Sequence, residues 1–177
     1  MNTEKRAVVL VGHGGLPSDC PDDLVARLKR LENQRRKQNL PPTEEELEID
    51  HKIRQWPRTP ESDPYKNGLE AIALQLSARL GPVKLVTAYN EFCAPTLEEA
   101  VDGLVQAGKD HISLVSTMFT PGGSHSEIEI PEEVRDLQLK YPEVEIVYAW
   151  PFDLRKVAEM LFQHIESFQS STQKQEV

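Results

Sequence analysis

Two histidines each follow an apolar run that has the composition of a buried strand. His13 comes directly after residues 7–12, and His125 follows residues 112–118 across a short loop. In an open parallel sheet the carboxyl ends of the strands meet at one edge, where ligands bind. We therefore expect the two imidazoles to share one site, although they lie far apart in the sequence. Such a pair is suited to hold a metal ion or to transfer protons.

A carboxylate joins the two imidazoles as a third candidate. Glu91 ends the predicted strand that precedes it, so that it reaches the same edge of the sheet. Two imidazoles and one carboxylate suit a divalent first-row metal and leave coordination positions open. A neutral imidazole can also accept a proton near pH 7. The alternative is that each histidine is a hydrogen-bonded structural group at a strand end.

Helical and strand patterns alternate along the chain. Strands are predicted at 6–12, 83–88, 112–117 and 144–148, and helices at 64–80, 96–106, from 131 onward, and from 154 to 168. This alternation predicts an α/β fold: an open, mainly parallel four-stranded sheet with helices on both faces. We expect one domain over residues 1–170 and a disordered polar tail over residues 171–177.

One connection is much longer than an ordinary strand-to-helix loop. Residues 17–63 form an insertion after the first strand, with a basic predicted helix over 22–38 and an acidic one that starts at the capping box Thr43–Glu46. Two interpretations stay open. The insertion is a helical hairpin whose opposite charges face each other, or an arm that offers arginines to ligand carboxylates. In both interpretations the part of the insertion next to His13 lies at the rim of the site.

Composition excludes several classes of protein. The net charge of −9 argues against general binding to nucleic acid or to an anionic membrane. The chain has only 2 cysteines, which rules out a disulfide scaffold and fits a reducing compartment. The first apolar run is too short for a signal peptide or a membrane span. We therefore expect a cytoplasmic protein that binds neither nucleic acid nor membrane.

The residues around the candidate site resemble a known family. Gly123-Ser124-His125 followed by Glu129-Ile130-Pro131, together with His13-Gly14 and Glu91, resembles the CbiX/SirB family of sirohydrochlorin chelatases. The resemblance covers roughly residues 6–16 and 64–166 and leaves the insertion outside. These enzymes are class II chelatases, which insert a divalent metal into a tetrapyrrole without ATP.

The resemblance implies roles for residues of this chain. His13 and His125 would hold the incoming metal and accept the pyrrole protons, with Glu91 assisting. Substrate contacts are expected at Gly14, Met118, Phe119 and Ser124. The metal, Co²⁺, Fe²⁺ or Ni²⁺, is expected to be a substrate, and ATP is not expected to take part. The partners implied are a tetrapyrrole and a second copy of the chain, with the macrocycle held between two faces of a homodimer. Alternatively, the insertion closes a monomeric site.

The chain departs from the family pattern at two positions. Gly15-Leu16 stands where family members usually have Ser-Arg, and Glu129 stands where Asp is common. The second change keeps the charge. The first removes a basic group near the substrate and leaves the identity of the tetrapyrrole open. The hypothesis is that the insertion supplies a replacement cation from among Arg27, Arg30, Arg35 and Arg36.

Two other functions compete with chelation. The first is a carrier that binds a metal or a tetrapyrrole without turnover. The second is a metal-dependent hydrolase, because a site of two histidines and a glutamate can activate water. The sequence favours the hydrolase less, since it has no HExxH motif and no obvious pair of metal-bridging carboxylates at the strand ends.

Overall fold

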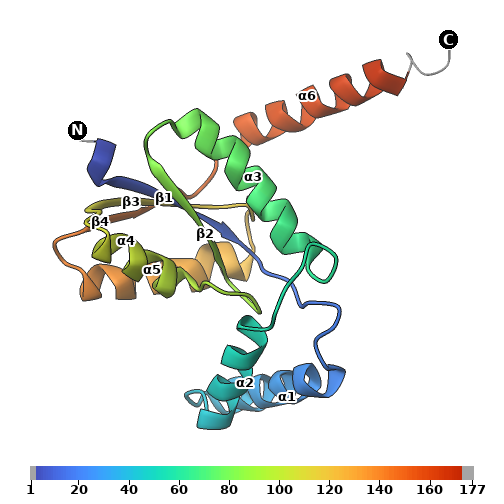
Figure 1. Cartoon of the computed structure of the whole chain (residues 1–177), viewed down its shortest axis with the longest axis vertical. Helices are drawn as coiled ribbons and strands as arrows, with labels where there is room; N and C mark the ends of the chain where they lie inside the picture. The colour runs from blue at the N-terminus through green and yellow to red at the C-terminus, as the bar shows by residue number, and fades with distance from the viewer. Residues whose placement is uncertain (1–2, 173–177) are drawn as a thin grey trace.

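A four-stranded parallel sheet forms the centre of the molecule (Figure 1). The computed structural model describes residues 3–172. The strand order is β2-β1-β3-β4. The strands run over β1 Arg6–Gly12, β2 Lys84–Tyr89, β3 His111–Ser116 and β4 Glu145–Tyr148. The predicted α/β fold is confirmed, and every pairing between neighbouring strands is parallel.

Two helices cover one face of the sheet. They are α4 (Leu97–Gln106) and α5 (Ile130–Lys140), and both pack on inward-facing strand residues such as Val9 and Leu114. Thr96 and Glu99 form a reciprocal capping box at the start of α4. Because alternate strand residues point to opposite faces, these helices bury one half of each strand's apolar side chains.

A third helix covers the opposite face, as predicted. In Figure 1, α3 (Pro64–Leu80) lies on the other side of the sheet from α4 and α5. Asp63 caps it by accepting a hydrogen bond from the backbone N–H of Lys66, and Pro64 occupies its first turn. Leu69 and Ala73 pack on Leu10 of β1 and Tyr89 of β2. The first turn of α3 therefore lies next to the carboxyl ends of β1 and β2.

The last helix, α6 (Leu154–Thr172), projects away from the sheet (Figure 1). Asp153 caps it, as the sequence predicts, by accepting a hydrogen bond from the backbone N–H of Arg155. Its apolar stripe is exposed, including Leu161 and Ile165. The helix continues past its predicted end at residue 168, since no glycine or proline interrupts residues 169–172. Residues 171–172 of the predicted tail therefore lie in α6, and residues 173–177 lie outside the described part.

The insertion forms a helical hairpin. Its helices are α1 (Asp22–Gln38) and α2 (Glu44–Arg54), and Figure 1 shows them side by side, apart from the sheet. Arg27 pairs with Glu45 and Arg35 pairs with Glu46, so opposite charges do face each other. The Thr43 hydroxyl accepts a hydrogen bond from the backbone N–H of Glu46. The carboxylate of Glu46 pairs with Arg35, so the predicted capping box forms only in part.

The helical segment that carries His125 begins earlier than predicted. A five-residue π-helix, η2 (His125–Glu129), runs directly into α5. The sequence predicted this helix to start at Pro131, where proline and two glutamates mark a first turn. The N–H of Ile130 donates to the carbonyl of His125 across this junction, and proline, which has no N–H, stands in the first turn of α5. Among the described residues, no helix is long and apolar enough to cross a membrane.

Candidate metal centre

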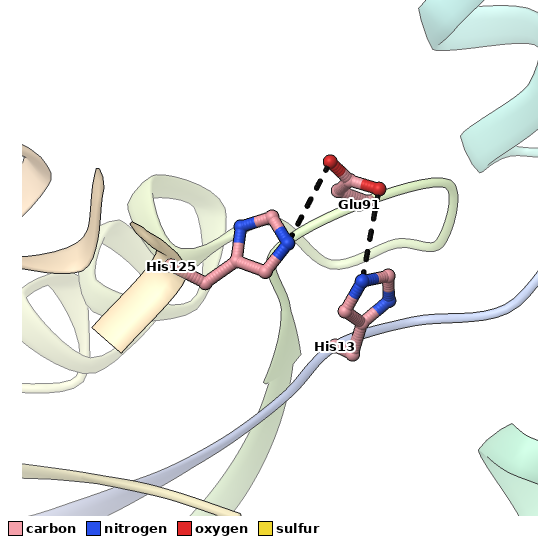
Figure 2. A group of neighbouring side chains, drawn as sticks. All are labelled: His13, Glu91 and His125. Atoms are coloured by element: carbon pink, nitrogen blue, oxygen red, sulfur yellow. Dashed lines mark ion pairs between the residues drawn. The ribbon is translucent and has the colours of Figure 1, made fainter. Parts of the chain in front are cut away.

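His13, Glu91 and His125 converge from three segments of the chain (Figure 2). Nε2 of His13 lies 3.9 Å from Oε2 of Glu91, and Nε2 of His125 lies 4.0 Å from Oε1 of the same carboxylate. The two imidazole rings meet edge to face, with centroids 4.8 Å apart. The predicted set of three ligands is therefore one cluster.

Strand register explains why these residues meet. Gly12 of β1 pairs with Tyr89 of β2, and Val11 pairs with Ser116 of β3, so the three strands end side by side. The ladder continues beyond β1 and β2, because the backbone N–H of Glu91 donates to the carbonyl of His13 over 2.7 Å. Backbone pairing therefore places His13 beside Glu91.

Gly14 permits an unusually close approach of the two loops. Its φ is +94°, a left-handed conformation that favours glycine. A Cβ atom at this position would lie 1.8 Å from the carbonyl oxygen of Glu91. A side chain here would therefore push the loop that carries Glu91 away from His13.

The His13 ring is oriented by its own loop and by α3. Nδ1 of His13 lies 2.8 Å from the carbonyl oxygen of Gly14. A carbonyl only accepts hydrogen bonds, so Nδ1 carries the proton and the lone pair of Nε2 faces Glu91. The backbone N–H of His13 donates to the hydroxyl of Tyr65, at 2.7 Å. This tautomer is the one that a metal ion at Nε2 requires.

The His125 ring is oriented by Glu129, which Asn90 holds in turn. Nδ1 of His125 donates to Oε2 of Glu129 over 2.9 Å, and the amide nitrogen of Asn90 donates to the same oxygen over 3.2 Å. Burial raises the pKa of Glu129, but hydrogen bonds from His125 and Asn90 outweigh it and hold the pKa below its usual value. The ionised carboxylate accepts the Nδ1 proton, so the Nε2 lone pair of His125 also faces Glu91.

The arrangement fits a loosely held divalent metal. Two nitrogen or oxygen ligands of one ion, each at about 2.1 Å, lie at most about 4.2 Å apart. Single ligand atoms from the three residues lie within 4.8 Å of one another, so a small shift of the side chains would close the set around one cation. The side chains of His13, Glu91 and His125 are 40%, 27% and 23% exposed. Three protein ligands that leave a coordination position open are typical of catalytic metal sites.

The other predicted contacts lie in different surroundings. Gly14 is part of the close approach to Glu91, whereas Ser124 is exposed and its side chain makes no capping hydrogen bond. Met118 packs against the core beneath α4 and α5. The ring of Phe119 lies 6.4 Å from that of Phe152. Their predicted role in substrate binding stays a prediction.

Two residues around His125 have no orienting role in the sequence analysis. Glu129 appears there only as part of the family pattern, and Asn90 is given no role. The four-residue spacing of His125 and Glu129 is a signal for contact on a helix, but it requires the helix to begin at His125. The π-helix supplies that condition.

A model of the CbiX family matches residues 61–167 of the chain. This segment contains Glu91, His125 and Glu129, and it covers more than half of the sequence. The chain belongs to the CbiX family. His13 and all but the last three residues of the insertion lie before the matched segment.

Two curated relatives, both from Priestia megaterium, match parts of the chain. A sirohydrochlorin cobaltochelatase is 29% identical over 96 residues, which are 54% of this chain and 31% of that protein. A sirohydrochlorin ferrochelatase is 28% identical over 76 residues, which are 42% of this chain and 28% of that protein. The matches thus span less than a third of the length of either relative.

Solved structures share the fold. The sirohydrochlorin chelatase SirB from Bacillus subtilis subspecies spizizenii, in complex with cobalt, has a TM-score of 0.54 and 19% identity over 92% of this chain and 50% of its own. A CbiX protein from Marinobacter aquaeolei VT8 has a TM-score of 0.55 and 14% identity over 93% and 98%. At these identities the likeness concerns the fold, which confirms the α/β architecture.

Proposed function

We propose that this protein is a chelatase that inserts a divalent metal into sirohydrochlorin or a related tetrapyrrole. The observation that carries the proposal is the orientation of His13 and His125, whose Nε2 atoms both face the carboxylate of Glu91. The CbiX family supplies the reaction class, because the matched relatives are named cobaltochelatase and ferrochelatase.

The reaction requires both a metal ligand set and proton acceptors. As the cation enters the macrocycle, two pyrrole N–H protons leave, and no electrons are transferred. In the proposed mechanism His13 and His125 hold the cation through Nε2, and Glu91 neutralises part of its charge. When the cation passes to the macrocycle, the same nitrogen lone pairs become available to take up the protons. No protein base besides His13 and His125 is required in this scheme.

The metal and the location remain part of the proposal. Imidazole and carboxylate ligands accept several first-row cations, and cellular availability often decides among them. The names of the relatives support Co²⁺ and Fe²⁺, and we keep Ni²⁺ as a third candidate. We propose that the reaction takes place in the cytoplasm without ATP.

We propose that Arg36 supplies the cation that the first loop lacks. Arg27 and Arg35 are engaged with Glu45 and Glu46 across the hairpin. Arg36 is exposed, and its positive charge adds to the hydrogen bonds that lower the pKa of Glu129 against the effect of burial. We therefore propose Arg36 as the arginine of the hairpin that meets a substrate carboxylate.

We also propose that the chain acts as a homodimer. Leu154, Leu161 and Ile165 of α6 are each about half exposed or more, an arrangement that favours burial against another surface. Val147 of β4, on the sheet face opposite α4 and α5, is 48% exposed. Light scattering tests the assembly: Ile165→Asp is expected to give monomers, whereas Gln163→Asp keeps the dimer. A monomeric, fully active wild type would contradict it.

The central experiment follows metal insertion by absorption spectroscopy. Sirohydrochlorin is incubated anaerobically with the protein and Co²⁺, Fe²⁺ or Ni²⁺. We expect multiple turnovers by the wild type and a loss of at least about 100-fold in kcat/KM for His13→Ala and His125→Ala, about 2.7 kcal/mol of transition-state stabilisation. His111→Ala, outside the site, is the matched control. Stoichiometric binding without turnover would favour the carrier and contradict the chelatase.

A further inference from the structure

A buried arginine of the insertion contacts the loops that carry His13 and Glu91. Arg58 lies between α2 and α3, and its side chain is only 7% exposed. It forms an ion pair with Asp63, whose side chain is 1% exposed and which also caps α3. Burying a charge is costly unless it is paired and hydrogen-bonded. A buried pair at this place therefore calls for an explanation.

The Arg58 guanidinium joins both loops that carry metal ligands. Nη1 donates to the carbonyl of Gly15, at 2.9 Å, two residues after His13. Nη2 donates to the carbonyl of Phe92, the residue after Glu91, and to the carbonyl of Ile53 at the end of α2, at 3.3 Å. One side chain thus bridges the His13 loop, the Glu91 loop and the insertion.

The loop that Arg58 holds has a strained backbone. Phe92 has a φ of +56°, a left-handed conformation that is unfavourable for a residue other than glycine. Such a conformation persists only where the surroundings hold it. The Phe92 ring packs against the small core of the insertion, which includes Leu28 and Ile53. Side chain and carbonyl of Phe92 are therefore both bound by the insertion.

A second arginine of the insertion holds the same loop from α2. Arg54 donates to the carbonyls of Asn90 and Cys93, at 3.1 and 3.2 Å, and is itself held by Asp50 at 2.7 Å. These carbonyls flank Glu91 on both sides. Asn90 in turn donates to Glu129, which accepts the proton of His125, so the Glu91 loop is linked to the third ligand.

We propose that Arg58 is a positioning residue for the metal centre, which fixes the distance between His13 and Glu91 by bridging their loops, with Arg54 in support. The inference rests on the proposed function, in which these side chains bind the incoming cation. It assigns the insertion a task besides any contact with substrate. Arginine suits this task because its planar fork donates several hydrogen bonds in fixed directions, whereas a lysine is a point charge.

The test is Co²⁺ binding to the full chain, measured by the visible ligand-field absorption without tetrapyrrole. Arg58→Lys keeps the charge beside Asp63 but cannot bridge the carbonyls of Gly15 and Phe92. We expect its affinity for Co²⁺ to fall at least tenfold, the range seen when groups that orient ligands are lost. Its spectrum should shift toward that of Glu91→Gln. Arg27→Lys, in the exposed pair of the same insertion, is the matched control and should bind as the wild type does.

A second readout separates positioning from folding. We expect hydrogen–deuterium exchange of Arg58→Lys to rise in the peptide that covers residues 90–93 and to stay unchanged over η2. If Arg58→Lys does not fold, Arg54→Lys is expected to weaken Co²⁺ binding in the same direction.

Two results would overturn the inference in different ways. If Arg58→Lys folds and has the wild-type Co²⁺ affinity and spectrum, the positioning role of Arg58 is rejected and the chelatase proposal stays intact. If Arg58→Lys does not fold, the same result in folded Arg54→Lys has the same meaning. If His125→Ala has the same Co²⁺ absorption as the wild type, the metal site itself is rejected and, with it, both proposals.

Discussion

The two halves of the metal centre are built in different ways. His13 and Glu91 lie in loops after β1 and β2, and the backbone of these loops is hydrogen-bonded to β1, to Tyr65 of α3 and to Arg58 of the insertion. His125 lies on η2, which continues into α5, and a side chain on the next turn orients its ring. The loop half therefore depends on distant segments, whereas the helix half is held mainly by its own segment.

This difference has a physical basis. A helix satisfies its own backbone groups and places side chains four residues apart on one face. A loop has no such internal pattern, so its backbone groups need partners from elsewhere. We expect substitutions that alter backbone contacts to damage the loop half most, and loss of one side-chain partner to affect the helix half moderately.

The largest effect is expected from Gly14→Ala. The new Cβ would lie 1.8 Å from the carbonyl oxygen of Glu91, in addition to the strain of a positive φ. We expect the free energy of unfolding to fall by more than about 2 kcal/mol and Co²⁺ affinity to fall more than about tenfold. Chemical denaturation and Co²⁺ titration measure the two quantities.

Gly122→Ala is the matched control for that substitution. Gly122 also has a positive φ, +88°, but a Cβ there meets no atom within 4 Å. It should cost about 1–2 kcal/mol of stability and leave Co²⁺ affinity unchanged. If Gly14→Ala and Gly122→Ala bind Co²⁺ equally well, the close approach of the two loops does not control metal binding by His13 and Glu91.

An intermediate effect is expected from Glu129→Gln in the helix half. The substitution removes the ionised acceptor of the Nδ1 proton of His125, so the ring loses its preferred tautomer and orientation. We expect Co²⁺ affinity to fall about tenfold, less than in Gly14→Ala, with little change in stability. Glu132→Gln, on the exposed side of α5, is the control and should bind normally. Equal affinities would show that the helix alone orients His125.

The same contrast explains what the sequence could predict. Strand patterns, together with the rule that the carboxyl ends of parallel strands meet at one edge, were enough to predict that His13, Glu91 and His125 lie together. Both depend only on the order of side-chain types along the sequence. The contacts of Arg58 involve backbone carbonyls of Gly15, Ile53 and Phe92, which every residue type possesses. No residue pattern marks such acceptors, so the bridge could not be predicted.

The last helix shows a second limit. The apolar stripe that includes Leu161 and Ile165 correctly predicted a helix, and it indicated a face that needs cover. In the structure that face is exposed. Periodicity specifies which side of a helix is apolar but does not specify which surface buries it, in the same chain or in another copy.

The smallest effect is expected from Asp102→Asn, which weakens the contact between α4 and α5. Burial raises the pKa of Asp102, but hydrogen bonds from Lys140 and Tyr141 outweigh it and hold the pKa below its usual value of 3.8. A carboxyl with a lowered pKa in the folded state stabilises the fold above its ordinary pKa. This contribution is lost as the pH falls through the lower, folded value.

At pH 7 we expect Asp102→Asn to lower the free energy of unfolding by less than about 1 kcal/mol, because the site is partly exposed. The difference from wild type should shrink steadily below about pH 4, as urea unfolding at several pH values would show. Co²⁺ affinity at pH 7 should not change, since η2 and α5 are one continuous segment. A clear fall in affinity would mean that α4 positions the helix half from outside, and both halves of the centre would then depend on distant contacts.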